Sequence, residues 1–344
     1  MNPQKIGIAM SGGVDSTAAA LILKEMAVVK GFFMRLSQPD YDEQLEKVTA
    51  VADQLGIDLE IVDLRASFQQ KVLDYFRESY FSGLTPNPCM VCNREIKFGL
   101  FQEAILGAGM DAMATGHYVQ LIKDSTGNHL HQGVDPLKDQ SYFLARLQRE
   151  QLEKVIFPLG QFHKKDIYTL VGEHGFHGFG GTESQDVCFF GDVTVGDYLA
   201  AHYPAQVQPG PIVTENGKTL GQHQGLFRYT VGQRRGLGIP DSTPWYVAGM
   251  DTNTNSLIVC KDEELYNKRI QIKGLHWLPM TPPQQNKKYT VRIRYSHRGS
   301  SAKIENLENH TATLLFDQPQ RAVTPGQFAV FYTDTELLGS GIIL

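Results

Sequence analysis

Over its first 120 residues the chain alternates between short apolar segments and longer segments with helical character. Four segments have the composition of strands: 6–10, 28–34, 59–62 and 111–115. Three segments between them favour helices: 17–26, 42–55 and 68–81. This alternation predicts a parallel sheet with helices on both faces. Because ligands of such sheets bind at the carboxyl ends of the strands, the loop after the first strand is the first candidate for function.

That loop contains a glycine pair in the sequence Ser11-Gly12-Gly13-Val14-Asp15-Ser16. Glycines let backbone amides approach a phosphate closely, and the helix that follows adds unpaired N–H groups and a positive dipole end. Ser11 and Ser16 add hydroxyl donors, and Asp15 beside a bound anion suggests a ligand for magnesium. The segment lacks the Gly-Lys-Ser/Thr of the Walker loop, which argues against a kinase or GTPase. We therefore expect a loop that binds pyrophosphate.

The rest of the chain differs in the composition and spacing of its segments. Glycine and proline punctuate short segments after about residue 155, and short strands dominate from Tyr289 onward, with the sequences TVRIRY, ATLLF and FAVFY. Regularly spaced short strands predict a small β-barrel or sandwich. We therefore expect three domains: an α/β domain over residues 1–155, a small mixed central domain over 156–268 and a C-terminal β-domain over 269–344.

The formal net charge of −5 argues against binding of nucleic acid over a generally basic surface. The charge is unevenly distributed, because residues 269–344 hold 9 Lys and Arg against 5 Asp and Glu. The C-terminal domain is thus a small basic module on an acidic body. No apolar run approaches the roughly 18 residues that would span a bilayer, and the first residues lack the pattern of a signal peptide. We expect a cytoplasmic protein without membrane contact.

Four cysteines in 344 residues are too few for a disulfide scaffold, so each thiol is a candidate for metal or redox chemistry. Cys89 and Cys92 have metal-ligand spacing, but a zinc site would need two more ligands and the chain has no second Cys-x-x-Cys pair. A helix is expected to begin near Asn93, and a cysteine at a helix N-terminus beside an arginine favours the thiolate form. Cys188 precedes two phenylalanines, and Cys260, in an apolar strand, is expected in the core.

Motifs in a fixed order give the sequence a family resemblance. They are SGGVDS at 11–16, TPNPCMVCN at 85–93, ATGHY at 114–118, KDQSYFL at 138–144, SQDVCF at 184–189, GQRRGLGI at 232–239 and TPGQ at 324–327. In this order they resemble the tRNA-specific 2-thiouridylase family of PP-loop ATP pyrophosphatases, over essentially the whole chain. The resemblance implies a PP-loop catalytic domain of adenine nucleotide alpha hydrolase-like fold, a central domain and a C-terminal β-barrel that contacts tRNA.

The resemblance also assigns roles to individual residues. Cys92 matches the nucleophile and Cys188 the carrier of a persulfide. ATP is expected to contact Ala9, Met10, Ser11, Gly12, Gly13, Val14, Asp15, Ser16, Met34 and Gly116. Transfer RNA is expected to contact Asn87, Pro88, Cys89, His117, Lys138, Asp139, Gln140, Arg294, Tyr295 and Gln327.

The implied activity replaces the O2 of a wobble uridine in tRNA with sulfur. This oxygen leaves poorly, and adenylation by ATP makes it part of AMP, a good leaving group, with release of pyrophosphate. Sulfur then arrives from the Cys188 persulfide, and the Cys92–Cys188 disulfide that results needs an external reductant. The implied cofactors are ATP and magnesium, and the implied partners of a monomeric enzyme are tRNA, a persulfide-carrying sulfur donor and the reductant.

Departures from the family pattern leave alternatives open. Cys89 stands where many relatives have an aspartate, a candidate general acid or base, so Cys89, Cys92 and Cys188 could instead hold an iron–sulfur cluster by three thiolates. The segment 181–183 lacks a lysine and an aspartate found in relatives, which leaves the activation of Cys188 open. The alternative activity is that of another PP-loop pyrophosphatase, such as an amide-forming synthetase, which would need neither Cys92 nor Cys188.

Overall fold

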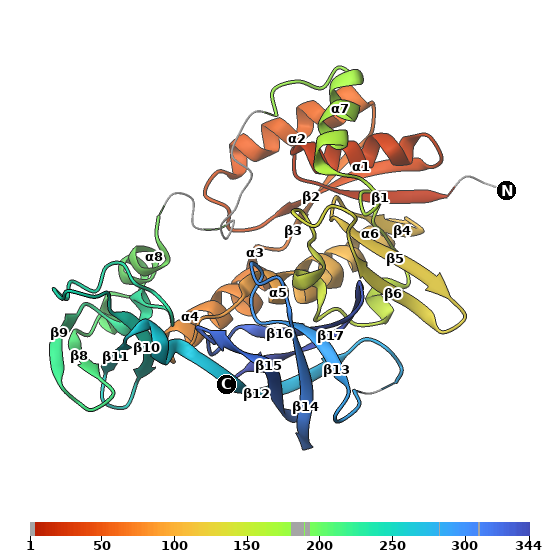
Figure 1. Ribbon diagram of the computed structural model, residues 1–344. Coiled ribbons are helices and arrows are strands. Elements are labelled where there is room, and N and C mark those ends of the chain that lie inside the picture. Colours follow the sequence, from red (N-terminus) through yellow and green to blue (C-terminus); the bar gives the residue numbers. More distant parts are fainter. Residues whose placement is uncertain (1–3, 180–188, 190–192, 282, 309) are drawn as a thin grey trace.

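The computed structural model describes residues 4–179, 189, 193–281, 283–308 and 310–344. Figure 1 shows an α/β unit from the first half of the chain, a small unit that carries β8–β11, and a barrel formed by the C-terminal part. This architecture confirms the predicted fold class, an α/β domain followed by a small mixed central domain and a β-barrel. No helix of the described residues is long and apolar enough to cross a membrane.

The first domain is built on a five-stranded parallel sheet with the order β3–β2–β1–β4–β7. Its strands are β1 (Lys5–Met10), β2 (Val28–Arg35), β3 (Leu59–Asp63), β4 (Ala112–Ala114) and β7 (Val155–Ile156). The central strands are apolar because helices cover both faces of the sheet. The strand order reverses between β1 and β4, and open α/β sheets bind ligands at such a point, outside the carboxyl ends of the strands.

Three helices pack on one face of this sheet (Figure 1). They are α1 (Val14–Lys24), α2 (Tyr41–Leu55) and α7 (Lys164–Glu173), which share a core with β1 and β2. Gly56 directly follows the helix predicted over 42–55, has φ +63° and caps α2 in the left-handed region. α7 lies beyond the predicted boundary at residue 155, yet its Ile167 and Val171 are buried in the same core as α1.

The helices between β3 and β4 contain two π-helical stretches. α3 (Arg65–Phe68), η1 (Gln69–Leu73) and α4 (Asp74–Phe81) follow one another directly, so the helix predicted over 68–81 starts earlier and contains a π-helical turn. α5 (Pro88–Val91), η2 (Cys92–Phe101) and α6 (Gln102–Gly107) form the second series. Gln151 donates from Nε2 to the carbonyl oxygens of Arg94 (2.7 Å) and Phe98 (2.8 Å), and so supports the wide turns of η2.

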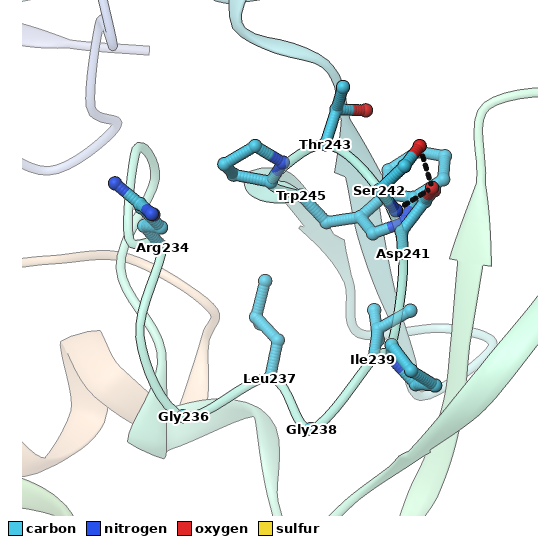
Figure 2. Close-up of a pocket in the computed structure, with 11 residues that line it drawn as sticks. Arg234, Gly236, Leu237, Gly238, Ile239, Asp241, Ser242, Thr243 and Trp245 are labelled. Carbon is cyan, nitrogen blue, oxygen red and sulfur yellow. Dashed lines mark hydrogen bonds between the residues drawn. The ribbon is translucent and has the colours of Figure 1, made fainter.

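The central unit contains α8 (Val195–His202) and a four-stranded sheet with the order β10–β11–β8–β9. Its strands are β8 (Gly210–Thr214), β9 (Thr219–His223), β10 (Tyr246–Asp251) and β11 (Ser256–Cys260). Ile212, Val247 and Leu257 fill its small core. The loop before β10 surrounds an open hollow of about 710 Å³, which is lined by Arg234 and residues 236–245 (Figure 2).

Six antiparallel strands close into the C-terminal barrel, in the order β12–β15–β14–β13–β16–β17, and β17 pairs back to β12. They are β12 (Tyr266–Trp277), β13 (Lys288–Arg292), β14 (Ser300–Glu308), β15 (Thr311–Arg321), β16 (Phe328–Thr333) and β17 (Glu336–Ile343). A hairpin of the first domain, β5 (Val119–Asp124) and β6 (Gly127–Gln132), continues this sheet beyond β17. The 3-10 turns are η3 (Ser141–Leu144), η4 (Glu150–Leu152), η5 (Pro204–Gln206), η6 (Leu226–Arg228) and η7 (Asp262–Leu265).

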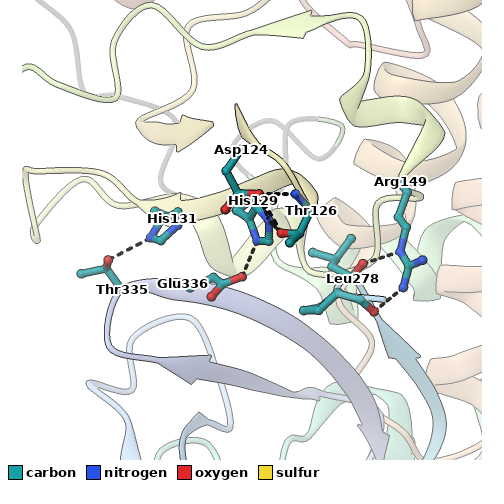
Figure 3. Close-up of polar contacts among 9 residues, drawn as sticks. Asp124, Thr126, His129, His131, Arg149, Leu278, Thr335 and Glu336 are labelled. Carbon is teal, nitrogen blue, oxygen red and sulfur yellow. Dashed lines mark hydrogen bonds and ion pairs between the residues drawn. The ribbon is translucent and has the colours of Figure 1, made fainter. Parts of the chain in front are cut away.

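Side chains tie the β5–β6 hairpin to the barrel (Figure 3). His129 lies 2.7 Å from Glu336 Oε1 and 3.3 Å from Asp124 Oδ1. His131 Nδ1 contacts Thr335 Oγ1 at 3.1 Å. The first domain and the barrel are therefore joined by polar contacts as well as by strand pairing.

Candidate active site

The glycine loop and the ATGHY segment meet where the strand order reverses. The loop follows β1, and residues 115–118 follow the neighbouring strand β4. Within the loop, Ser16 Oγ accepts from Ser11 N (3.2 Å), donates to Gly13 O (3.0 Å) and lies 3.4 Å from Ser11 Oγ. Gly12 has φ +73°, a conformation that glycine adopts freely. These contacts fold the loop over the N-terminus of α1, as a phosphate cradle requires.

Asp15 is held by two side chains from outside the loop. Both of its carboxylate oxygens accept from Lys164 Nζ (2.7 and 2.8 Å), and Oδ1 also accepts from Tyr118 OH (2.6 Å). Gly116 lies so close that a Cβ there would meet the carbonyl carbon of Asp15 at 2.9 Å. Because the buried Lys164 ammonium group contacts both oxygens, this arrangement does not fit the magnesium ligand that the sequence suggests at Asp15.

The cysteine pair lies on a helix that begins earlier than expected. Asn87 Oδ1 accepts from Met90 N (3.2 Å) and caps α5, whose first residue is Pro88. Cys89 therefore stands in the first turn of the helix, and Cys92 begins η2 after it. The expectation of a helix N-terminus near Cys92 is wrong, because the fixed φ of Pro88 and the Asn87 cap start the helix sooner. The N-terminal dipole acts first on Cys89, and both thiols are half-buried.

The segment that leads into the cysteine pair is held by both other domains. Thr85 N donates to Pro325 O (2.9 Å), and Gln327 Nε2 donates to the carbonyl oxygens of Thr85 (2.9 Å) and Pro86 (3.3 Å). Thr85 Oγ1 also donates to Thr230 Oγ1 of the central domain (3.3 Å). The expected tRNA contact Gln327 thus directs its amide nitrogen at the TPNP segment.

The KDQ motif lies at the junction between the first domain and the barrel. Asp139 is 4% exposed and accepts from Arg292 Nη1 (2.8 Å) and from both N and Oγ of Ser141 (3.0 Å each). Gln140 Oε1 accepts from Tyr118 N (3.0 Å), which links the motif to the ATGHY segment. The buried Asp139 carboxylate therefore joins two domains and does not face solvent.

An aromatic pair lies beside the cysteine helix. The Tyr295 ring, 38% exposed, packs on Phe143 with ring centroids 4.5 Å apart and 33° between the planes. Phe143 O accepts from Asn93 Nδ2 (3.2 Å), and Asn93 directly follows Cys92. Aromatic rings with an exposed face are platforms for unstacked bases. The pair therefore places a partly exposed aromatic side chain next to the helix that carries Cys92.

His117 packs against Phe98 and Phe157, with ring centroids 5.5 and 6.2 Å away, and its Nδ1 contacts Thr115 Oγ1 at 2.8 Å. Burial, with the nearby charge of Lys97 adding to it, lowers the pKa of His117 well below its ordinary value. The imidazole is therefore neutral near pH 7. It can donate or accept a hydrogen bond, but it cannot supply positive charge to a phosphate.

Other predicted residues lie around these groups. Met34 stands near the carboxyl end of β2, Lys138 is half-buried in a turn, and Arg294 Nη1 donates to a backbone carbonyl of β15 (3.2 Å). Cys260 is 2% exposed and burial raises its pKa to about 11, which confirms its place in the core. Cys188 lies outside the described residues. No group of three His, Cys, Asp or Glu side chains suited to a metal occurs in the part of the chain that the structure describes.

Sequence reasoning missed three side chains that shape the site. Lys164 contacts a loop and Gln151 contacts a helix that lie far away in the sequence, and nothing in their own surroundings signals this. Arg292 offered a partial signal, because the alternation of β13 places it outside the barrel, where an arginine is normally exposed. It is buried because the first domain covers that face of the barrel.

Comparison with known proteins agrees with this geometry. Residues 4–192 match a family model described as tRNA methyl transferase HUP domain, 196–261 match the corresponding PRC-barrel domain, and 267–343 match an aminomethyltransferase beta-barrel domain. A Desulfotalea psychrophila protein named tRNA-specific 2-thiouridylase MnmA is 54% identical over 338 residues, which cover 98% of each chain. A Magnetococcus marinus protein of the same name is 42% identical and covers 99% of each chain. The chain therefore belongs to the tRNA-specific 2-thiouridylase family.

Proposed function

We propose that the protein is a tRNA 2-thiouridylase, which uses ATP to replace the O2 of a wobble uridine with sulfur. The observation that carries the proposal is the cysteine segment 85–92, held by contacts from both other domains, in a chain 54% identical to a protein of that name. An amide-forming synthetase, the alternative activity, needs neither this thiol pair nor a basic barrel that packs against it.

In the first proposed step, the uracil O2 attacks the α-phosphorus of ATP, which forms the O2–AMP bond and releases pyrophosphate. The loop of Ser11–Ser16 binds the pyrophosphate through backbone N–H groups, two hydroxyls and the N-terminus of α1. The Lys164–Asp15 pair is neutral as a whole. Its contribution is therefore to fix the shape of the loop and not to add net charge.

In the second proposed step, the terminal sulfur of a Cys188 persulfide attacks C2 of the uracil and expels AMP. The Cys92 thiolate then attacks Cys188 Sγ, which forms a Cys92–Cys188 disulfide and leaves the terminal sulfur on C2. In the variant route, Cys92 attacks the persulfide first and releases hydrosulfide, which then attacks C2. Both routes end in the same disulfide, and two electrons from an external reductant restore the thiols.

The iron–sulfur route is the alternative proposal for sulfur delivery. Cys89 and Cys92, at positions i and i+3 of one helical segment, fit two thiolate ligands on one side of it. The third ligand of that proposal, Cys188, lies outside the described residues. Magnesium enters the proposal as the ion that accompanies ATP, held by phosphate oxygens and water and not by Asp15.

We also propose a monomeric, cytoplasmic enzyme that receives sulfur from a persulfide-carrying protein. The basic barrel supports direct binding of tRNA, which supplies a large partner surface without a second protein subunit. The half-buried Cys92 supports a closed reaction site, since hydrosulfide and adenylated uridine both need protection from water.

Reconstitution tests the proposal. Anaerobically purified protein is incubated with an unmodified tRNA transcript, ATP, magnesium and a cysteine desulfurase charged with persulfide, and the nucleosides are analysed by mass spectrometry. We expect 2-thiouridine and an equal amount of AMP from the wild type, and loss of 2-thiouridine in Cys92→Ser and Cys188→Ser. Cys260→Ala, a change in the central-domain core, serves as the control.

Each outcome decides between the proposals. Retention of 2-thiouridine in Cys92→Ser refutes the assigned role of this thiol, and consumption of ATP without change in the tRNA favours the synthetase. Iron and acid-labile sulfide are measured in the same preparation, together with the activity of Cys89→Ser. Active protein without iron and sulfide refutes the cluster, whereas iron that is lost together with activity in Cys89→Ser refutes the persulfide route.

A further inference from the structure

The GQRRGLGI motif at 232–239 belongs to the family pattern, but the steps above give it no task. In the structure it forms a loop of fixed shape in front of β10. The loop turns at three glycines in the left-handed region, with φ of +86°, +82° and +65°: Gly232, Gly236 and Gly238. Leu237 between them is buried in the central core and anchors the loop.

Gln233 holds the loop from inside. Its Oε1 accepts from Thr230 N (3.1 Å), and its Nε2 donates to Arg235 O (2.9 Å). Its backbone carbonyl accepts from Val247 N (3.0 Å), which attaches the loop to β10. The backbone that carries the two arginines after Gln233 is therefore preorganised.

Arg234 and Arg235 are exposed, and neither guanidinium has an ion pair or a hydrogen bond within the described part of the chain. Other cations of this region are paired at 2.7 to 2.9 Å: Arg228 with Asp197, Lys261 with Asp241, and Arg321 with Asp262. The two arginines thus stand out as cations available to an anion from outside. The planar fork of arginine matches a phosphate with two parallel hydrogen bonds.

The base of this loop touches the elements that hold the cysteine segment. A Cβ at Gly232 would lie 2.6 Å from Ala322 Cβ, just after β15 and just before the TPGQ turn. Thr230, two residues before the loop, contacts Thr85. Figure 2 shows the residues that line the open hollow, with Arg234 on one side and Trp245 on another. The arginines therefore stand on the central-domain side of the junction that presents Cys92.

We propose that residues 232–239 form a binding surface for the sugar-phosphate backbone of the tRNA, with Arg234 and Arg235 as its phosphate contacts. This inference rests on the proposed function and adds the central domain to the tRNA contacts expected in the first domain and the barrel. Phosphate contacts carry no sequence information, so the loop contributes affinity and register while the choice of base is made near Cys92.

The test measures binding of a fluorescent, unmodified tRNA by anisotropy over a series of salt concentrations. Arg234→Ala/Arg235→Ala is compared with the wild type and with Lys165→Ala/Lys218→Ala, which removes two exposed lysines whose ammonium groups likewise have no ion pair or hydrogen bond within the described residues. Loss of two phosphate contacts is expected to make the slope of log K against log salt shallower by about 1.5 and to weaken binding about tenfold at 0.1 M salt. The control is expected to keep the wild-type slope and the wild-type rate of 2-thiouridine formation, whereas the arginine double variant is expected to need about tenfold more tRNA to reach its half-maximal rate.

Each other outcome overturns the inference. A double variant that folds, judged by its thermal unfolding, and keeps wild-type affinity and slope shows that the loop makes no phosphate contact. Unchanged tRNA binding with slower sulfur transfer from the donor protein assigns the loop to a protein partner. Failure of the wild type to bind tRNA at all refutes the proposed function itself, which is a distinct result.

Discussion

The buried pair of Asp139 and Arg292 gives the sharpest prediction about how the domains are held together. Arg292→Met leaves the Asp139 carboxylate, 4% exposed, with only neutral donors, the backbone and side chain of Ser141 among them. Removal of one partner from a buried ion pair costs about 3–5 kcal/mol. We expect this loss in the free energy of unfolding, measured by urea titration, for both Arg292→Met and Asp139→Asn.

The double variant separates the pair from its surroundings. Asp139→Asn/Arg292→Met buries no lone charge, so it is expected to be more stable than the sum of the two single changes predicts, by about 2 kcal/mol or more. Arg269→Met is the matched control, because it breaks a solvent-screened surface pair with Glu305 and should cost far less stability than either buried change. Single variants with wild-type stability but weaker tRNA binding would refute the reasoning, since Asp139 would then act on the RNA directly.

Four further changes test the site and the hairpin. Gln327→Glu places a carboxylate against the carbonyl oxygens of Thr85 and Pro86 and should displace the cysteine segment. Turnover at saturating tRNA should then fall at least tenfold, and the rate at which Cys92 is alkylated in tRNA-free protein should change. A variant that loses only tRNA affinity contradicts this role of Gln327. Lys164→Ala releases Asp15, and tRNA-dependent pyrophosphate release should fall at least tenfold, whereas an unchanged rate means that the loop keeps its shape without the lysine. Gly116→Ala forces a Cβ to within 2.9 Å of the Asp15 backbone and should abolish ATP binding in calorimetry, and wild-type affinity would show that the loop gives way. Glu336 raises the pKa of His129, chiefly by its hydrogen bond, so the stability that the protonated His129 adds to the fold is complete below about pH 6.5 and is lost as pH rises through the raised pKa. The thermal midpoint should therefore fall more between about pH 6.5 and 8 in the wild type than in Glu336→Gln. Parallel curves for the two proteins would refute the coupling.

Local chemistry made part of this molecule predictable from its sequence. The Ser11–Ser16 loop and the Gly56 cap follow from residues next to one another, and the alternation of strands and helices follows from short-range patterns. The Asp139–Arg292 pair joins residues 153 positions apart, and Gln327 reaches a carbonyl 242 positions away. Nothing in the local sequence distinguishes such a residue from one that faces a ligand, since a polar group in a loop serves either purpose.

The start of the cysteine helix, by contrast, depends on neighbouring residues and was within reach of local reasoning. A Pro-Cys step after an asparagine is a strong local helix start, but the expectation near Asn93 gave weight to the residues after the thiols instead. The π-helical turns of η2 were beyond local reasoning, because Gln151, which contacts their carbonyl groups, belongs to a distant turn.

The hydrogen bonds between the TPGQ turn and the TPNP segment have a consequence for folding during synthesis of the chain. Residues 85–92 leave the ribosome well before the side chain that fixes them, because Gln327 lies 242 positions after Thr85. A nascent chain can fold its glycine loop and bind ATP long before its thiol segment is secured. Synthesis of the TPGQ turn therefore acts as a maturation step, and a chain that is cut short before this turn should remain unable to modify RNA even with its nucleotide site intact.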